Sequence, residues 1–289
     1  PGRTRLFLTI EKLLARLTDR IIVISGQQRR EINEKFRVGR AGQFAVIPLG
    51  VDLNIYSKWR ERREQSRQEL NVGADEILVG IVGRLTEIKN HKLFLQVVKS
   101  FKKMSHGRVR FVIIGDGHLR AELEKQVDEL GLRDDVFFSG SRQDPENFYP
   151  ALDVVALTSL NEGTPLSLIE GMANARPVIA TAVGGVVDLL GAQVSDQPEP
   201  GFTLHERGLA VASGDTDGFV KGLDYLIRNE SLRRELGGRG HDFVNQNYAK
   251  ERLLVDMTAL YAKLLNVESA AEAAPHNSLS PSHLGRGKG

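Results

Sequence analysis

The stretch that decides the fold is Val154-Val-Ala-Leu-Thr-Ser-Leu-Asn-Glu-Gly-Thr-Pro-Leu-Ser-Leu-Ile-Glu170. It begins with an uninterrupted apolar run at 154–157, continues through a polar loop that contains glycine, and ends in a segment whose pattern predicts a helix over 165–175. A continuous apolar run is typical of a strand that is buried on both faces, as in a parallel sheet covered by helices. The stretch therefore predicts one strand-loop-helix unit of an α/β fold.

The loop and the helix start within this stretch have the composition of a ligand site. Thr164 is the predicted N-cap and Pro165 the predicted first helical residue, so unpaired N–H groups and the positive helix end would attract an anion. Gly163 would let the backbone approach a ligand closely. Glu162 and Glu170 would repel free phosphate, but they suit the hydroxyl groups of a sugar and a ribose that are attached to one. The alternative is a loop glutamate and a surface glutamate without a ligand.

The same alternation of Val- and Ile-rich runs with longer amphipathic segments extends from about residue 56 to about residue 265. Strands are predicted at 77–82, 109–114, 136–138, 154–157, 178–180 and 209–212. Helices are predicted at 91–104, 118–130, 145–151, 165–175, 217–228, 232–245 and 250–265. Units of this spacing predict a doubly wound, Rossmann-like parallel sheet.

The first fifty residues form a second, incomplete pattern. Here we predict helices at 5–18 and 27–36 and strands at 21–24 and 44–47. The run at 21–24 is apolar on both faces and should lie inside a sheet, yet no earlier strand is present to flank it. We interpret residues 1–50, which begin with Pro1 and no methionine, as the remnant of an amino-terminal domain and its linker.

Three segments are therefore expected, with the main domain at 51–266 and its last helix, 250–265, packing back toward the missing part. Residues 267–289 are rich in Ala, Pro, Ser, His and Gly and lack aromatic residues, so they predict a disordered tail.

Composition excludes several classes of function. The formal net charge of the 289 residues is +2 with acidic and basic residues interleaved, so nucleic acid is not an expected partner. The absence of cysteine excludes disulfides, thiol catalysis and thiolate-bound zinc, and it fits a cytoplasmic protein. No cluster of His, Asp and Glu has the spacing of metal ligands, so no metal is predicted. Residues 3–20 combine cations with apolar residues and predict a packed interdomain helix, with a peripheral contact on the inner face of the plasma membrane as the alternative.

A second loop, Gly83-Arg-Leu-Thr-Glu-Ile-Lys89, directly follows the strand predicted at 77–82. Ligands of open α/β sheets bind outside the carboxyl ends of the strands, which is where this loop must lie. Arg84 can bind a phosphate through two donors and Lys89 adds a second charge, so the pair suits a diphosphate. The alternative is two solvated cations.

Two smaller features follow the strand predicted at 109–114. Gly115-Asp-Gly117 is either a phosphate-binding turn or a tight strand-to-helix turn. His118 is either a ligand contact or an exposed side chain without a role.

The order of these motifs resembles a known family. Gly83-Arg84 with Lys89, "VIPLGVD" at 46–52, "GDGHLRAELE" at 115–124 and "EGTPLSLIEGMANARPVIATAVGG" at 162–185 are similar to the carboxyl-terminal domain of retaining family-4 glycosyltransferases, also called glycosyl transferases group 1, with the GT-B fold. The resemblance covers most of residues 21–265.

The resemblance implies specific roles. Arg84 and Lys89 would bind the diphosphate of the donor and, with Glu162, act in catalysis. Glu162 would contact hydroxyls of the transferred sugar, and Glu170 would bind the ribose. Further donor contacts would come from Gly83, Gly163, Thr164, Pro165 and Leu166, and base contacts from Gly140, Ser141 and Arg142.

The implied activity is transfer of a sugar from a nucleotide-diphosphate sugar to a glycan or lipid-linked acceptor, with retention of configuration, as in the synthesis of bacterial cell-envelope polysaccharides. UDP is the favoured nucleotide, with GDP and ADP as alternatives, and the nucleotide sugar is a co-substrate, so no cofactor is expected. The alternative function is a non-catalytic nucleotide-sugar-binding module or one half of a split enzyme. A sugar-nucleotide epimerase would share the architecture, but Glu162 and Glu170 argue against it.

Overall fold

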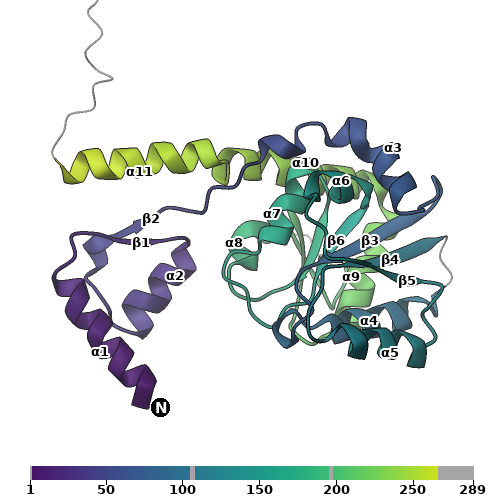
Figure 1. The fold of residues 1–289 in the computed structure, drawn as a ribbon, viewed down its shortest axis with the longest axis horizontal. Helices are drawn as coiled ribbons and strands as arrows, with labels where there is room; N and C mark the ends of the chain where they lie inside the picture. Colours follow the sequence, from purple (N-terminus) through teal and green to yellow (C-terminus); the bar gives the residue numbers. More distant parts are fainter. Residues whose placement is uncertain (1, 105–107, 195–197, 266–289) are drawn as a thin grey trace, which may run out of the picture.

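The computed structural model describes residues 2–104, 108–194 and 198–265, so the predicted tail at 267–289 lies outside the described residues. Its main feature is a seven-stranded sheet in the order β5-β4-β3-β6-β7-β9-β8 (Figure 1). All neighbouring strands are parallel except β8, which runs antiparallel to β9. The strands are β3 (Ile77–Val82), β4 (Val109–Ile114), β5 (Val136–Gly140), β6 (Val154–Leu157), β7 (Val178–Thr181), β8 (Thr203–His205) and β9 (Gly208–Val211).

This sheet confirms the predicted doubly wound α/β fold. The chain adds β4 and β5 on one side of β3 and then returns to place β6 on the other side. In the sheet Ile81 lies opposite both Ile113 and Ala156. The reversal between β3 and β6 is a topological switch point, where the loops after the two strands diverge and leave a crevice. The short edge strand β8 is not predicted, because its three residues show no apolar run.

Helices cover both faces of the sheet. Helices α4 (His91–Phe101), α5 (Arg120–Glu129) and α9 (Thr216–Arg228) cover one face, and α6 (Pro145–Phe148), α7 (Leu166–Ala173) and α8 (Val186–Leu190) cover the other. In β3 the fully buried Val79 and Ile81 belong to the first core, and Leu78 belongs to the second. This burial on both faces is why the strand sequences are continuously apolar.

All predicted helices have counterparts whose ends differ by up to three residues, and two α-helices were not predicted. The helix predicted at 145–151 is α6 followed by a 3₁₀ turn, Tyr149–Ala151. The predicted start of the next helix is wrong, because α7 begins at Leu166 and Pro165, with an extended backbone (φ −76°, ψ 91°), is the cap. Thr164 is therefore not the N-cap. The omissions are the short α8 and α3 (Trp59–Glu69), whose sequence has a single apolar residue and no periodicity.

The amino-terminal part forms a separate small unit of α1 (Gly2–Arg16), β1 (Ile21–Val23), α2 (Gly26–Arg30) with a π-helical continuation, Glu31–Lys35, and β2 (Phe44–Val46). Strand β1 pairs in parallel with β2, and within the described residues it has no second neighbour, so Ile22 stays 44% exposed. Apolar side chains of α1, among them Phe7 and Leu13, are also exposed. The interdomain helix and the membrane contact both stay predictions for this segment.

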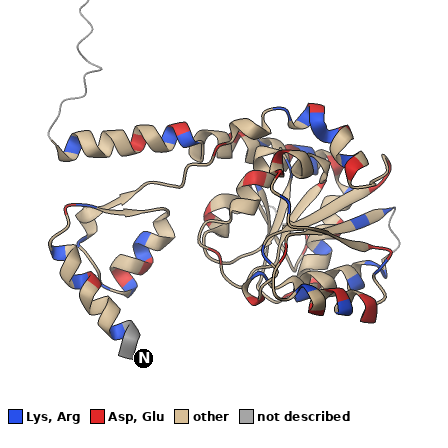
Figure 2. Cartoon of the chain, in the orientation of Figure 1, with Lys and Arg blue, Asp and Glu red and all other residues tan. Residues whose placement is uncertain are grey.

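A linker joins the two parts along the carboxyl-terminal helices α10 (Glu230–Asn247) and α11 (Lys250–Leu264) (Figure 1). The amide of Val51 donates to the carbonyl of Tyr248, and Arg252 donates to the carbonyls of Pro48 and Leu49. Figure 2 shows that acidic and basic residues alternate over both parts of the described chain. None of the helices in that part of the chain is long and apolar enough to cross a membrane.

Candidate functional site

The loops after β3 and β6 meet at the switch point. The Nζ atom of Lys89 lies 2.6 Å from Oε1 of Glu162, and Ser159 Oγ donates to the same oxygen at 2.6 Å. The Glu162 side chain is only 9% exposed and that of Lys89 25% exposed. Two residues that are 73 positions apart thus form one ion pair at the carboxyl edge of the sheet.

Buried hydroxyl groups fix the backbone of these loops. Thr158 Oγ1 donates to the carbonyls of Lys89 and Asn90, at 3.1 and 3.0 Å. Thr181 Oγ1, at the end of β7, donates to the carbonyl of Ser159 at 2.6 Å. Three neighbouring strand ends are therefore cross-linked without using the charged side chains.

Close backbone packing explains Gly115 and Gly117. A Cβ at Gly115, where φ is +142°, would lie 2.0 Å from the carbonyl oxygen of Gly83, and one at Gly117 would lie 2.5 Å from that of Leu85. The amide of Leu85 also donates to the carbonyl of Asp116. Of the two readings of this turn, the structure favours a tight turn that supports the loop of Arg84.

Gly184 and Gly185 play the same part for the second loop. A Cβ at Gly184 would lie 1.8 Å from the carbonyl oxygen of Glu162, and one at Gly185 would lie 1.9 Å from that of Gly163. The amide of Gly185 donates to the Glu162 carbonyl at 3.1 Å. Sequence reasoning missed this positioning role, for which the signal was a Gly-Gly pair at the end of a strand.

The edge leaves cationic and backbone groups open to solvent. Arg84 is exposed and forms no ion pair with any residue that the structure describes. A Cβ at Gly163 would meet no atom within 4 Å. Helix α7 begins three residues later, at Leu166, and the first amide that bonds within it is that of Leu168, which donates to the carbonyl of Pro165. The two amides before it, and with them the positive end of the helix, lie beside Gly163.

A cavity of about 160 Å³ lies against this loop, between the two parts of the chain. Asn161, Glu162 and Gly163 line one side, and Ser25 and Gln28 of the amino-terminal unit line the other. Glu162 therefore forms the ion pair with Lys89 and also lines this cavity.

Glu170 lies within α7 beside two tyrosines that the sequence analysis did not identify. Tyr149 Oη donates to Glu170 Oε2 at 2.9 Å, and Tyr149 and Tyr56 are both buried. Burial raises the pKa of Glu170, while the hydroxyls of Tyr149 and Tyr56 act in the opposite direction. A tyrosine among apolar residues is ordinarily predicted to be part of the hydrophobic core. The local sequence therefore gives no sign that Tyr56 and Tyr149 lie beside Glu170.

Two of the three residues predicted to contact the base already have hydrogen-bond partners within the protein. Arg142 is held by Asp144 and by Glu69 of α3, and its guanidinium lies over Phe148. The carbonyl of Gly140 accepts from the amide of Gly115 at 2.9 Å. A base-binding role for Gly140, Ser141 and Arg142 stays a prediction.

Two histidines flank the first loop. His118 lies 3.0 Å from Glu87 of the same edge and is exposed. His91, the first residue of α4, is buried, and burial followed by the charge of Lys89 lowers its pKa to about 4. Among the described residues no group of three or more His, Asp or Glu side chains could hold a metal ion.

Comparison with known proteins identifies relatives of this chain. The family described as Glycosyl transferases group 1 matches residues 62–243, which is more than half of the chain. The lipopolysaccharide core biosynthesis glycosyltransferase LpsE of Rhizobium meliloti is 28% identical over 199 residues, or 69% of this chain and 52% of LpsE. Across eight curated relatives the chain spans 35% to 60% of the relative's length.

Solved structures of glycosyltransferases are also similar to this chain. HepE of Anabaena, in complex with UDP and glucose, matches with a TM-score of 0.74 and 22% identity over 90% of this chain and 67% of HepE, which shows a common fold. The carboxyl-terminal domain of LpcC, a glycosyl transferase group 1 family protein of Francisella tularensis, is 27% identical with a TM-score of 0.58 and covers 69% of this chain and 99% of that domain. The chain therefore belongs to the glycosyl transferases group 1 family.

Proposed function

We propose that the carboxyl edge of the sheet binds a nucleotide-diphosphate sugar and that the intact protein transfers its sugar to an acceptor with retention of configuration. The observation that carries this proposal is the meeting of Lys89 and Glu162 at the switch point, next to the exposed Arg84. Arg84 and Lys89 supply positive charge for a diphosphate, and Glu162 supplies an acceptor for sugar hydroxyls. Hydrolysis by a carboxylate pair is not part of this scheme, because Glu162 is assigned a binding role.

The proposed mechanism is electrostatic. Breaking the bond between sugar and phosphate places negative charge on the departing nucleoside diphosphate, which Arg84, Lys89 and the positive end of α7 would stabilise. An ammonium group has three donors, so Lys89 can keep its bond to Glu162 and still donate to the diphosphate. The Glu162 carboxylate would then be held in one orientation for the sugar.

Glu170 is assigned to the ribose. Tyr149 orients its carboxylate by a hydrogen bond. Because Glu170 lies in buried surroundings, hydroxyl groups of a bound ribose would take the place of water as hydrogen-bond donors to this carboxylate. The UDP and glucose bound to HepE support a nucleotide sugar as the donor, and the role of LpsE in lipopolysaccharide core biosynthesis supports a lipopolysaccharide-like glycan as the acceptor class. We favour UDP as the nucleotide.

The acceptor site is assigned to a second domain. Exposed apolar side chains on α1, such as Phe7 and Leu13, and on α11, such as Leu254 and Val255, suit packing against further protein. The share of the relatives' length that this chain spans supports the same assignment. We therefore expect donor binding by this chain, and transfer only by the longer protein.

Thermal shift and calorimetry with UDP-glucose, GDP-glucose and ADP-glucose test the proposal. At 100 times its dissociation constant a donor should add about 2.7 kcal/mol to the free energy of unfolding. Arg84→Ala should weaken donor binding about tenfold or more, because it removes a charged hydrogen bond to phosphate. Lys92→Ala is the matched control, since Lys92 is exposed on α4 and pairs with Glu122.

No stabilisation by any of the three donors would contradict the proposal, as would an equal loss in the Lys92 variant. If donor binds but the longer protein transfers no sugar to lipid-linked glycans, the non-catalytic module becomes the better assignment.

A further inference from the structure

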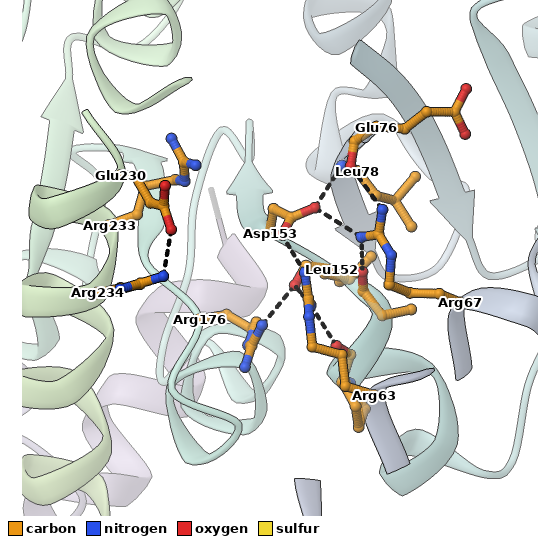
Figure 3. Close-up of polar contacts among 12 residues, drawn as sticks. Arg63, Arg67, Glu76, Leu78, Leu152, Asp153, Arg176, Glu230, Arg233 and Arg234 are labelled. Carbon is orange, nitrogen blue, oxygen red and sulfur yellow. Dashed lines mark hydrogen bonds and ion pairs between the residues drawn. The ribbon is translucent and has the colours of Figure 1, made fainter. Parts of the chain in front are cut away.

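A second charged cavity lies at the opposite, amino edge of the sheet. It has a volume of about 480 Å³ and is bounded by α3, by α10 and by the residues that lead into β6 and β7 (Figure 3). Asp153 immediately precedes β6, and Pro177 immediately precedes β7. The candidate donor loops follow β3 and β6, so the cavity shares strand β6 with them but lies at the opposite end of that strand.

Arginines dominate the lining. Five arginines face two carboxylates there: Arg60, Arg63, Arg176, Arg233 and Arg234 against Asp153 and Glu230. Asp153 is already held by Arg63 and by Arg67 behind it, at 2.5 and 3.0 Å, and Glu230 is held by Arg234 at 2.5 Å. No carboxylate of the described residues forms an ion pair with Arg60, Arg176 or Arg233, so positive charge is left over.

The unpaired arginines are held in place by uncharged groups. Arg176 is 7% exposed, donates to the carbonyls of Asn174 and Leu152, and stacks 4.5 Å from the ring centroid of Trp59. Arg60 lies over the same ring at 4.4 Å. Arg233 donates to two carbonyls at the end of α9. Guanidinium groups that are fixed in this way lose little entropy when an anion binds.

The surroundings add to the positive potential. Burial, and then the charge of Arg63, lower the pKa of Arg176 to about 9, with Asp153 opposing. Helix α10 begins at Glu230 beside the cavity, so its positive end also faces this region. A phosphate group is the ligand whose charge and geometry match several guanidinium forks at once.

We propose that this cavity binds a soluble organic phosphate of sugar-phosphate size. Its volume falls within the range of small-molecule sites, roughly 300–1,000 Å³, and exceeds what a single inorganic phosphate would fill. An anionic membrane surface is a poorer match, because α3 and α10, which bound the cavity, also carry the exposed acidic residues Glu61, Glu64 and Glu235. The proposal does not depend on the donor site.

Trp59 gives this cavity its own reporter, because it is the only tryptophan of the 289 residues. The chain is titrated with glucose 6-phosphate, with sodium sulfate and with vesicles of phosphatidylglycerol at constant ionic strength. We expect a saturable change of tryptophan fluorescence with glucose 6-phosphate and a much weaker one with sulfate. A response equal to that of sulfate would overturn the assignment to an organic phosphate, and a response to vesicles alone would assign a membrane contact instead.

Two matched pairs of variants tie the response to the cavity. A Cβ at Gly238, which lines the cavity, would meet no atom within 4 Å, so a side chain can start there. Gly238→Glu adds a carboxylate to the lining, and Gly238→Gln is its neutral control of nearly the same size. Arg234 and Arg239 both pair with a glutamate four residues earlier on α10, but only Arg234 lines the cavity.

Compared with Gly238→Gln, Gly238→Glu should weaken glucose 6-phosphate at least about tenfold, because it sets like charges against each other. Arg234→Gln should weaken binding, and Arg239→Gln should leave it unchanged. Circular dichroism and thermal unfolding confirm that each variant is folded. Equal affinity in the Glu and Gln variants, or no saturable response in the parent chain, would overturn the proposal.

Discussion

The two edges of the seven-stranded sheet hold their charged groups by different means. At the carboxyl edge, glycines and buried hydroxyls fix the backbone, through contacts such as those of Gly185 and Thr158. Among the described residues of this edge, Arg84 is thereby left exposed and without an ion pair. At the amino edge, side chains do the fixing, and Arg63, Arg67 and Asp153 hold carbonyls and amides at the strand ends.

Because of this difference, substitutions at the carboxyl edge should affect ligand binding more than the stability of the fold, and substitutions at the amino edge should affect stability. A side chain can be changed at the carboxyl edge with the backbone still in place, whereas a change in the Asp153 cluster removes part of the framework. The difference also explains why the second cavity is best tested at Gly238 and Arg234, which lie on its rim, and not at the buried Arg176.

The largest effect is expected for Asp153→Asn. Asp153 is 15% exposed, and the change removes the carboxylate partner of the buried Arg67 and of the partly exposed Arg63. The free energy of unfolding should fall by about 3–5 kcal/mol in urea denaturation. Asp75→Asn, in an exposed pair with Arg108, should change it by less than about 1 kcal/mol. Similar losses in both variants would show that the amino edge is not the framework described above.

A second prediction concerns the pH dependence of stability at the carboxyl edge. Both ring nitrogens of the buried His91 lack a hydrogen-bond partner among the described residues, and its pKa is lowered from 6.5 to about 4. The unfolded chain therefore binds the proton more readily, so stability is full above pH 6.5 and is lost as the pH falls toward 4.

Relative to His91→Leu, the parent chain should lose about 3 kcal/mol across that window, as measured by urea unfolding at pH 8, 6 and 4.5. Parallel pH profiles for the two proteins would show that His91 is not the group responsible.

A third prediction separates positioning from contact. Gly185→Ala would drive its Cβ into the Gly163 carbonyl, so it should cost about 1–3 kcal/mol of stability and also weaken UDP-glucose binding. Gly163→Ala meets no protein atom, so stability should change by less than about 0.5 kcal/mol while donor binding is still hindered. Thermal unfolding and calorimetry on the same samples distinguish the two outcomes, and a stable Gly185→Ala variant would contradict the packing argument.

The smallest effect is expected for Glu170→Gln. Burial raises the pKa of Glu170 in the folded protein above its value in the unfolded chain. The contribution of this group to stability is therefore full at a pH below the unfolded pKa and is lost as the pH rises through the folded pKa. The Gln variant lacks this dependence and should be as stable as the parent or slightly more stable at pH 7, within about 1 kcal/mol, because one hydrogen bond to Tyr149 is altered. Weaker UDP-glucose binding without lost stability would support the ribose role, and a clear loss of stability would point to a structural one.

Part of this organisation could be predicted from sequence. The continuous apolar runs of β3, β4, β6 and β7 indicated strands buried on both faces, because burial on both faces leaves no polar positions. Helix α3 could not be found in the same way, because arginine side chains hold it to the Asp153 cluster in place of an apolar stripe. The start of α7 was misplaced because Pro165 and Thr164 fit the statistics of caps, while the backbone of Pro165 is still extended.

The sequence by itself determined the strands except β8, most of the helices and the two loops that carry Arg84, Lys89 and Glu162, since periodicity and loop composition are local properties of the chain. Only the tertiary structure decided that β6 lies beside β3, so that Lys89 reaches Glu162, and that Gly184 and Gly185 pack under that loop. The reason is physical: strand order and backbone contacts depend on how whole layers pack, and groups 73 residues apart carry no mark of each other in the sequence.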